Sequence, residues 1–347
     1  MKRERGIILI VVMWGLMVLM VLAAELARTV RLEALTTDVY QQEVSAYYLA
    51  TAGLQRALYQ IVRAQQQGRN MLNMPGGLFG QPPGGFGQQF GLRPPGMLGQ
   101  QTAEQQLDVW VRGDGRWKQE EFASGGYWVR VVDEAGKINL NQVDEATLRQ
   151  TLANLGFDME SAQLLTDTIQ DWRDPDPLAR IHGAENDYYL SLPVPYPAKD
   201  GPFDSVEELL LVHGVTPALF YGREGPALRE LFTVYSGAGG SVNLLTASPL
   251  VLRAVLGLDA AAVQDLVQRR SEASGANLAG LFPGGAGRGV NFGLPQIVTI
   301  ESIGYLNESS VTRRVSAAVQ RVGANGFRFV RWKDRIDGGE TPVPQEG

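Results

Sequence analysis

Residues 6–24 form a run of nineteen residues without a charged side chain. As a helix this run would be about 28 Å long, which matches the hydrocarbon thickness of a bilayer. The helical pattern continues past Glu25 to about Gln66 and contains no proline. The sequence therefore predicts one long N-terminal helix, whose residues 7–24 cross a membrane and whose remainder is amphipathic.

The charges that flank the apolar run indicate its orientation. Lys2, Arg3 and Arg5 precede it, so we expect the short N-terminus to stay in the cytoplasm and the body to lie on the far side. A secretory signal peptide cut near Ala24 is the alternative. Against it, the run exceeds the about 7–15 apolar residues of a signal peptide, and the helical pattern continues past the cut.

The composition excludes several classes of function. A net charge of −6 provides no basic field for nucleic acid. The chain has no cysteine and only two histidines, which excludes disulfides and cysteine metal sites and leaves little for zinc or histidine catalysis. Paired carboxylates such as Asp174 and Asp176 could perform acid–base chemistry, but no nucleophile–base pair or cofactor loop accompanies them. We therefore expect a protein that is not an enzyme.

The amphipathic half of the helix carries an apolar stripe at three- and four-residue steps. Its members are Val44, Tyr47, Thr51, Leu54, Leu58 and Ile61. This stripe predicts packing against a sheet. A juxtamembrane coiled coil is the alternative, but the small residues 50–53 do not suit a strict heptad seam.

Alternating apolar residues predict strands at 107–111, 127–134, 297–305, 310–321 and 327–332. A long helix followed by antiparallel strands indicates an α+β fold. The strands are divided by about 150 residues, so we expect a large inserted all-α domain. The predicted parts are 1–6 leader, 7–66 helix, 67–102 Gly/Pro-rich insertion, 103–136 first part of the sheet, 137–289 inserted domain, 290–333 second part of the sheet and 334–347 tail.

Two segments of the predicted inserted domain repeat one pattern, starting at Ile138 and Val242. Each has an Asn-Leu pair, a polar cap, a helix, a Leu-Gly turn and a second helix, and residues 203–216 form a partial third copy with a capping-box spacing. These units resemble helix-hairpin-helix or SAM-like modules, so a membrane-tethered DNA-binding protein is the alternative function. However, each hairpin has one glycine, and two carry an aspartate where a phosphate would bind.

The densest polar cluster lies between the first and third copies. Its acidic members are Asp171, Asp174, Asp176, Glu185 and Asp187. Three carboxylates would turn toward one point where a helix ends, and oxygen-only ligands suit Ca²⁺, although the spacing of an EF-hand is missing. The cluster therefore indicates a calcium site. A solvated acidic loop balanced by Arg173 and Arg180 is the alternative.

The N-terminus resembles that of the type IV prepilins, because a short basic leader abuts an apolar helix. In that family a membrane-embedded prepilin peptidase cuts after the glycine and the new N-terminal residue is methylated. Carried over, the cut lies between Gly6 and Ile7. Residues 46–58 also look like the pilin helix. Most pilins carry glutamate at the fifth mature position, where this chain has Val11.

The whole chain, apart from residues 68–100 and the tail, resembles the minor pseudopilin K family (general secretion pathway protein K) of type II secretion systems, within the type IV pilin-like superfamily. The leader without the glutamate, the pilin sheet and the inserted domain with its acidic run at 171–176 carry this resemblance.

This resemblance implies a non-enzymatic subunit that caps the tip of a periplasmic pseudopilus and helps initiate its assembly for protein export across the outer membrane. The implied partners are minor pseudopilins I and J, other pseudopilins, the inner-membrane secretion platform and the prepilin peptidase, with no nucleic acid. It also implies a single-pass inner-membrane location with a periplasmic bulk, and calcium in the inserted domain.

Overall fold

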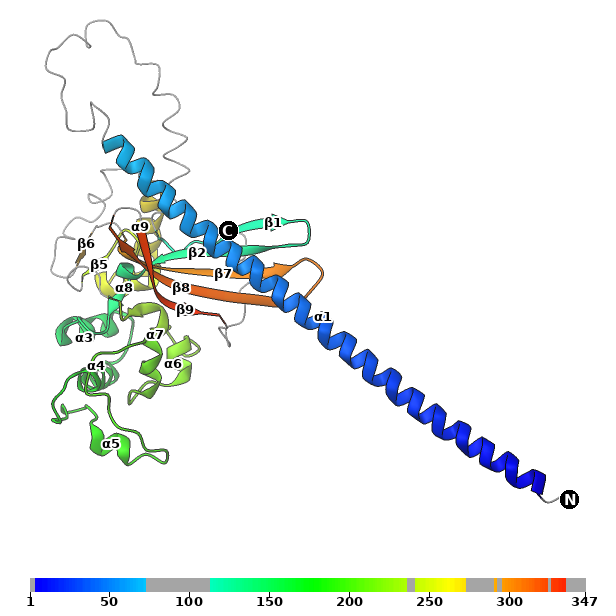
Figure 1. The fold of residues 1–347 in the computed structure, drawn as a ribbon. Helices are drawn as coiled ribbons and strands as arrows, with labels where there is room; N and C mark the ends of the chain where they lie inside the picture. The colour runs from blue at the N-terminus through cyan, green and yellow to red at the C-terminus, as the bar shows by residue number, and fades with distance from the viewer. Residues whose placement is uncertain are drawn as a thin grey trace, which may run out of the picture.

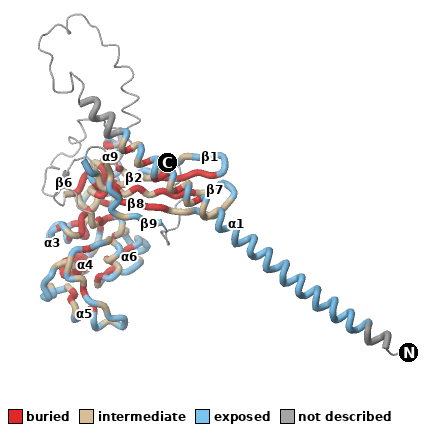
Figure 2. The backbone as a smooth tube through the Cα atoms, viewed as in Figure 1, coloured by how far each residue is buried: buried red, intermediate tan, exposed pale blue. Residues whose placement is uncertain are grey.

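A computed structural model describes residues 4–72, 113–235, 241–272, 290–291, 295–323 and 326–334. Its dominant element is α1 (Glu4–Leu72), a single helix that projects far beyond the rest of the chain (Figure 1). Within the described residues, one helix segment, Leu9–Arg63, is long and apolar enough to cross a membrane. The described side chains in the N-terminal half of this helix are exposed (Figure 2). The predicted long helix is confirmed, and it ends six residues later than expected.

The C-terminal half of α1 packs on a five-stranded antiparallel sheet in the order β1-β2-β7-β8-β9. The strands are β1 (Lys118–Phe122), β2 (Gly125–Asp133), β7 (Ile297–Leu306), β8 (Thr312–Val322) and β9 (Gly326–Lys333). Four of them match predicted strands. β1 was not predicted, and the strand expected at 107–111 lies outside the described residues. The helix-on-sheet, pilin-like fold class is therefore confirmed.

Small residues bring α1 close to the sheet. Ala46, Ala50 and Ala57 are fully buried, whereas Tyr47 and Leu58 of the predicted stripe lie at the margin of the contact. A Cβ atom built at Gly53 would lie 2.6 Å from the ring of Tyr127. The face that contacts the sheet is thus rotated by about one residue from the predicted stripe, because small side chains allow the two backbones to approach.

Residues between β2 and β7 form the inserted domain, which has its own hydrophobic core. Its helices are η1 (Glu134–Gly136), α3 (Glu145–Asn154), α4 (Met159–Arg173), α5 (Asn186–Leu190), η2 (Val206–Leu211), α6 (Pro217–Tyr221), α7 (Leu228–Leu231), α8 (Pro249–Leu256) and α9 (Ala260–Glu272). Two short parallel strand pairs accompany them: β3 (Ile138–Asn139) with β4 (Phe232–Thr233), and β5 (Val242–Asn243) with β6 (Val290–Asn291). The domain is therefore mainly helical but not strictly all-α, and β6 pairs within it rather than with the large sheet.

The two predicted repeats use the same side-chain chemistry. In the first, Arg173 at the end of α4 donates to the carbonyl oxygens of Leu140 and Val143 before α3. In the second, Arg270 in α9 donates to the carbonyl oxygens of Leu244 and Ala247 before α8. In each repeat an arginine of the second helix satisfies backbone acceptors before the first, which would otherwise remain unpaired in the interior.

Candidate functional site

The acidic cluster is organised around Asp171, whose side chain is fully buried in the last turn of α4. Arg180 Nη1 donates to Asp171 Oδ1 at 2.5 Å and to Asp174 Oδ2 at 2.6 Å, and Arg180 N donates to Asp171 Oδ2 at 3.1 Å. A Cβ atom at Gly183 would collide with the Asp171 carboxylate. The loop after α4 therefore wraps closely around this carboxylate, and glycine is required where it passes.

Glu185 is buried immediately before α5, and neither of its carboxylate oxygens has a hydrogen-bond partner in the described part of the chain. Asp174 Oδ1 is also buried without a partner among these residues. Burial, together with the charges of Asp171, Asp200, Asp174 and Asp176, raises the pKa of Glu185 to about 7. A bound cation would pair with buried oxygens that lack hydrogen-bond donors, and the surrounding negative charges would attract it.

The predicted ligands do not all take part. Asp176 is exposed, and its Oδ1 accepts from Leu178 N at 3.0 Å. Asp187 is exposed and is not among the charges that act on Glu185, whereas Asp200, which sequence reasoning missed, is. Among the described residues no three acidic or histidine side chains stand close enough together to hold a metal ion as they lie. The unpaired oxygens are of the type that calcium prefers, but as they lie they form no metal site, and the calcium ligand set remains a prediction.

The helical hairpins do not offer free phosphate-binding amides. Asp158 Oδ1 accepts from Ser161 N at 2.9 Å at the start of α4, and Asp259 Oδ1 accepts from Ala262 N at 2.8 Å in α9. An aspartate thus occupies the amides to which a DNA phosphate would bind, and its charge would repel the phosphate. This geometry does not favour the alternative DNA-binding function.

The second candidate site is the uncovered face of α1. Beyond the membrane segment, Tyr48 and Tyr59 are exposed on the side of the helix opposite the buried Ala46 and Ala57, with 66% and 56% of their surfaces accessible. Val39, with 48% accessible, lies two turns before Ala46 on the sheet-facing side, where α1 projects beyond the sheet. Apolar side chains that line a projecting helix and face away from its own sheet typically mark a protein or membrane contact. Gly6 and Ile7 lie in α1, but their side chains are outside the described set, and Val11 is exposed in its membrane segment.

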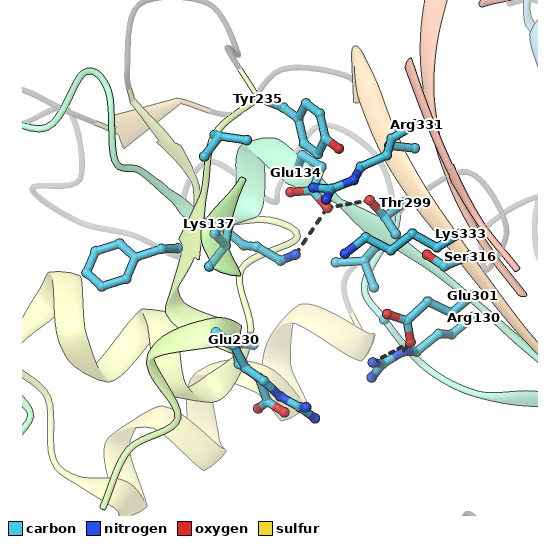
Figure 3. A pocket seen from close by; sticks show the side chains of 18 of the residues that line it. Arg130, Glu134, Lys137, Glu230, Tyr235, Thr299, Glu301, Ser316, Arg331 and Lys333 are labelled. Carbon is cyan, nitrogen blue, oxygen red and sulfur yellow. Dashed lines mark hydrogen bonds and ion pairs between the residues drawn. The ribbon is translucent and has the colours of Figure 1, made fainter. Parts of the chain in front are cut away.

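A buried polar junction fixes the inserted domain to the sheet. Asp133, at the end of β2, accepts from Asn243 Nδ2 at 2.9 Å and Thr246 Oγ1 at 2.8 Å. The next residue, Glu134, accepts from Thr233 Oγ1 and Thr299 Oγ1, each at 2.5 Å. The latter contact and that of Lys137 with Glu134 are drawn in Figure 3. These bonds join both halves of the inserted domain to neighbouring strands of the sheet.

Comparison with known proteins shows similarity to one family. The family model described as "Type II secretion system (T2SS), protein K" matches residues 131–228. Type II secretion system protein K of Pectobacterium carotovorum subsp. carotovorum is 27% identical over 231 residues, which is 63% of this chain and 61% of that protein. The chain is therefore similar to type II secretion system protein K over these residues. The matched part spans less than two thirds of that relative.

The fold of this chain has a solved counterpart. A structure of the GspK–GspI–GspJ complex from the enterotoxigenic Escherichia coli type 2 secretion system matches with a TM-score of 0.57 and 14% identity. The match covers 88% of this chain and 99% of the matched chain. At this identity the match shows a shared fold. A single apolar N-terminal helix is also compatible with a single-pass inner-membrane protein.

Proposed function

We propose that this chain is a minor pseudopilin at the tip of the periplasmic pseudopilus of a type II secretion system, where it helps initiate assembly for protein export. The observation that carries the proposal is the combination of a pilin-like α1-on-sheet body with a large domain inserted between β2 and β7. The body supplies a helix that can pack among other pilin-like helices. The inserted domain supplies bulk that a subunit inside a shaft would have to accommodate.

Val11 supports a terminal position. In pilin-like filaments the carboxylate at the fifth mature position is thought to meet the free N-terminal amine of the subunit assembled just before. An ammonium and a carboxylate in an apolar environment are each costly alone and tolerable when paired. A subunit with nothing above it has no amine to pair, so a lone glutamate there would cost several kcal/mol, on the order expected for an uncompensated charge. Valine avoids this cost.

The proposal includes processing and orientation. The leader is removed between Gly6 and Ile7 by the prepilin peptidase, Ile7 is methylated, and the body lies in the periplasm. Intact-mass analysis of the membrane form should give a chain that starts at methylated Ile7. A chain that starts near Ala24 would indicate a conventional signal peptide and would contradict the pilin-like assignment.

Calcium would act as a structural ion in the inserted domain. Asp171, Asp174, Glu185 and Asp200 would supply its oxygens, which relieves the unpaired buried carboxylate of Glu185. Arg180 forms ion pairs with Asp171 and Asp174, so at least one of these two ion pairs would have to break when calcium binds. A cation that binds the folded domain alone stabilises it by mass action.

The partners proposed are minor pseudopilins I and J, which contact the exposed face of α1, together with other pseudopilins and the inner-membrane secretion platform. The full chain, tagged and purified in detergent from cells that produce I, J and the major pseudopilin, should bring down I and J. Tyr48→Arg, on the exposed face of α1, should reduce their recovery, whereas Arg253→Gln, on the exposed surface of α8, should not. Recovery of neither I nor J with the unmodified chain would refute the proposed complex.

A further inference from the structure

A cleft of about 700 Å³ lies between the sheet and the inserted domain. Its floor is the sheet face opposite α1, where alternate residues of β2, β7 and β8 point away from the helix. Its other wall comes from η2, α6 and α7 of the inserted domain. Charged side chains from both walls point into it (Figure 3).

Most charges in the cleft are paired with a neighbour. Arg130 on β2 and Glu301 opposite it on β7 form an ion pair at 2.7 Å. Across the two walls, Glu207 in η2 pairs with Lys333 of β9 and lies 3.5 Å from Arg331. The carboxylates of Glu301 and Glu207 are thus already engaged by cations of the cleft walls.

Arg314 on β8 differs from them. Its side chain is partly buried in the cleft wall, and within the described residues it forms no hydrogen bond or ion pair. Burial lowers the pKa of Arg314, Glu301 opposes this, and the charges of Arg130 and Arg229 lower it further. Arg229, from α7, lies over the ring of Tyr221 at 5.5 Å. Arg130 and Arg314 therefore both act on Glu301, which is already engaged with Arg130.

We propose that this cleft binds an acidic segment of a partner protein, whose carboxylates pair with Arg314 and Arg229. A guanidinium fork matches a carboxylate in geometry and charge, and such pairs are the strong hydrogen bonds of protein interfaces. Six cationic side chains and five carboxylates line the cleft, and the one surplus positive charge defines the sign of the ligand. The apolar side chains of Val206 and Phe220 on the opposite wall would contact the rest of the segment.

The size of the cleft argues for a peptide rather than a free anion. Pockets of about 300–1,000 Å³ hold ligands of many atoms, whereas inorganic phosphate would fill only the part beside Arg314. This proposal does not depend on the position of the subunit in the pseudopilus, because both walls belong to one chain.

The test is binding of a fluorescein-labelled tetraglutamate peptide to the full chain in an uncharged detergent at low salt, followed by fluorescence anisotropy. Arg314→Gln and Arg229→Gln should each weaken binding by at least about tenfold, as expected for loss of one partner of a charge pair. Arg314→Lys keeps the charge and should weaken binding less than Arg314→Gln. Arg253→Gln removes the same charge from an exposed site of α8 outside the cleft and should change the Kd by less than about twofold.

Thermal melts of the free variants separate binding from folding. Because Arg314 lies among other cations, Arg314→Gln should leave the melting temperature of the free chain unchanged or raise it. A lower melting temperature with unchanged peptide binding would assign Arg314 a structural role and overturn the proposal. Equal Kd values for Arg314→Gln and Arg253→Gln, binding of a tetraglutamine peptide with similar affinity, or displacement of the peptide by inorganic phosphate at matched ionic strength would also overturn it.

Discussion

Asp133→Ala removes the carboxylate that ties the end of β2 to the turn before α8. The side chain is only 1% exposed, and its loss leaves Asn243 Nδ2 and Thr246 Oγ1 without this acceptor. Loss of this acceptor costs about 1–3 kcal/mol at Asn243 Nδ2 and about 1 kcal/mol at Thr246 Oγ1, which keeps a contact with the carbonyl oxygen of Asn243 at 3.2 Å. Loss of the bond from Ala135 N, at 3.0 Å, adds about 1 kcal/mol, so the total cost is about 3–5 kcal/mol. Burial raises the pKa of Asp133, which means that removal of the buried charge returns part of this cost. We expect a net loss of about 3 kcal/mol in the local opening free energy, or roughly a hundredfold in the opening equilibrium.

Hydrogen–deuterium exchange of the full chain in detergent measures this loss locally. Backbone amides of β5 and α8 should exchange roughly a hundredfold faster in Asp133→Ala, and less so in Asp133→Asn, which keeps an acceptor oxygen. Asp144→Ala is the matched control, because this exposed aspartate caps α3 through Thr147 N at 2.9 Å. Loss of that cap costs about 1 kcal/mol and should affect α3 alone. If β5 and α8 exchange no faster in Asp133→Ala than in Asp144→Ala, the junction does not hold the two domains together.

Three further outcomes are expected. The pKa of Asp133 is raised in the folded chain. Its stabilising contribution is therefore complete below the unfolded pKa of about 4 and is lost as the pH rises through the pKa of the folded chain. The ratio of the exchange rate of Asp133→Asn to that of the unmodified chain should accordingly be larger at about pH 4 than at about pH 7. Gly53→Ala should destabilise the contact of α1 with the sheet by about 1 kcal/mol, because an overpacking cost of about 1–3 kcal/mol outweighs a helix-propensity gain of about 1 kcal/mol. Hydrogen–deuterium exchange at β7 should show this loss. Gly15→Ala, whose added Cβ atom would meet nothing within 4 Å, should show no such loss. Calcium should raise the melting temperature of the unmodified chain and of Asp187→Asn but not of Glu185→Gln, and equal melting temperatures with calcium and with chelator, together with no bound metal by mass spectrometry, would refute the site.

The sequence predicted the strands well and the contact face of α1 less well. Strands β7, β8 and β9 alternate apolar and polar residues, and this period alone identifies them. In α1 the large residues Tyr47 and Leu58 dominate the hydrophobic pattern, yet alanines and Gly53 make the closest contact. Small residues carry little hydrophobic signal, so the sequence pattern underestimates a face whose function is close approach of backbones.

The candidate calcium site was predicted only in part. Asp171, Asp174 and Glu185 lie near one another because the loop after α4 returns at once to the helix end, and Arg180 rather than a metal pairs with the first two. Asp200 comes from a loop beyond α5, and only the folded chain brings its charge to Glu185. Asp200 has a positive φ of 49°, and the sequence feature that matches this conformation is the Asp-Gly pair it forms with Gly201, which is typical of turns. The cleft arginines are likewise far apart in the sequence and could not be associated from spacing.

The position of this chain at the pseudopilus tip is tested most directly by disulfide crosslinking in assembled pseudopili. The chain has no cysteine, so a cysteine introduced at Tyr48 or Tyr59, which share the exposed face of α1, reports one contact each. Paired with cysteines along the helices of I, J and the major pseudopilin, these positions should trap I or J, and on one side of the helix only. Crosslinks to the major pseudopilin on both the upper and the lower side would place the chain inside the shaft and contradict the tip assignment.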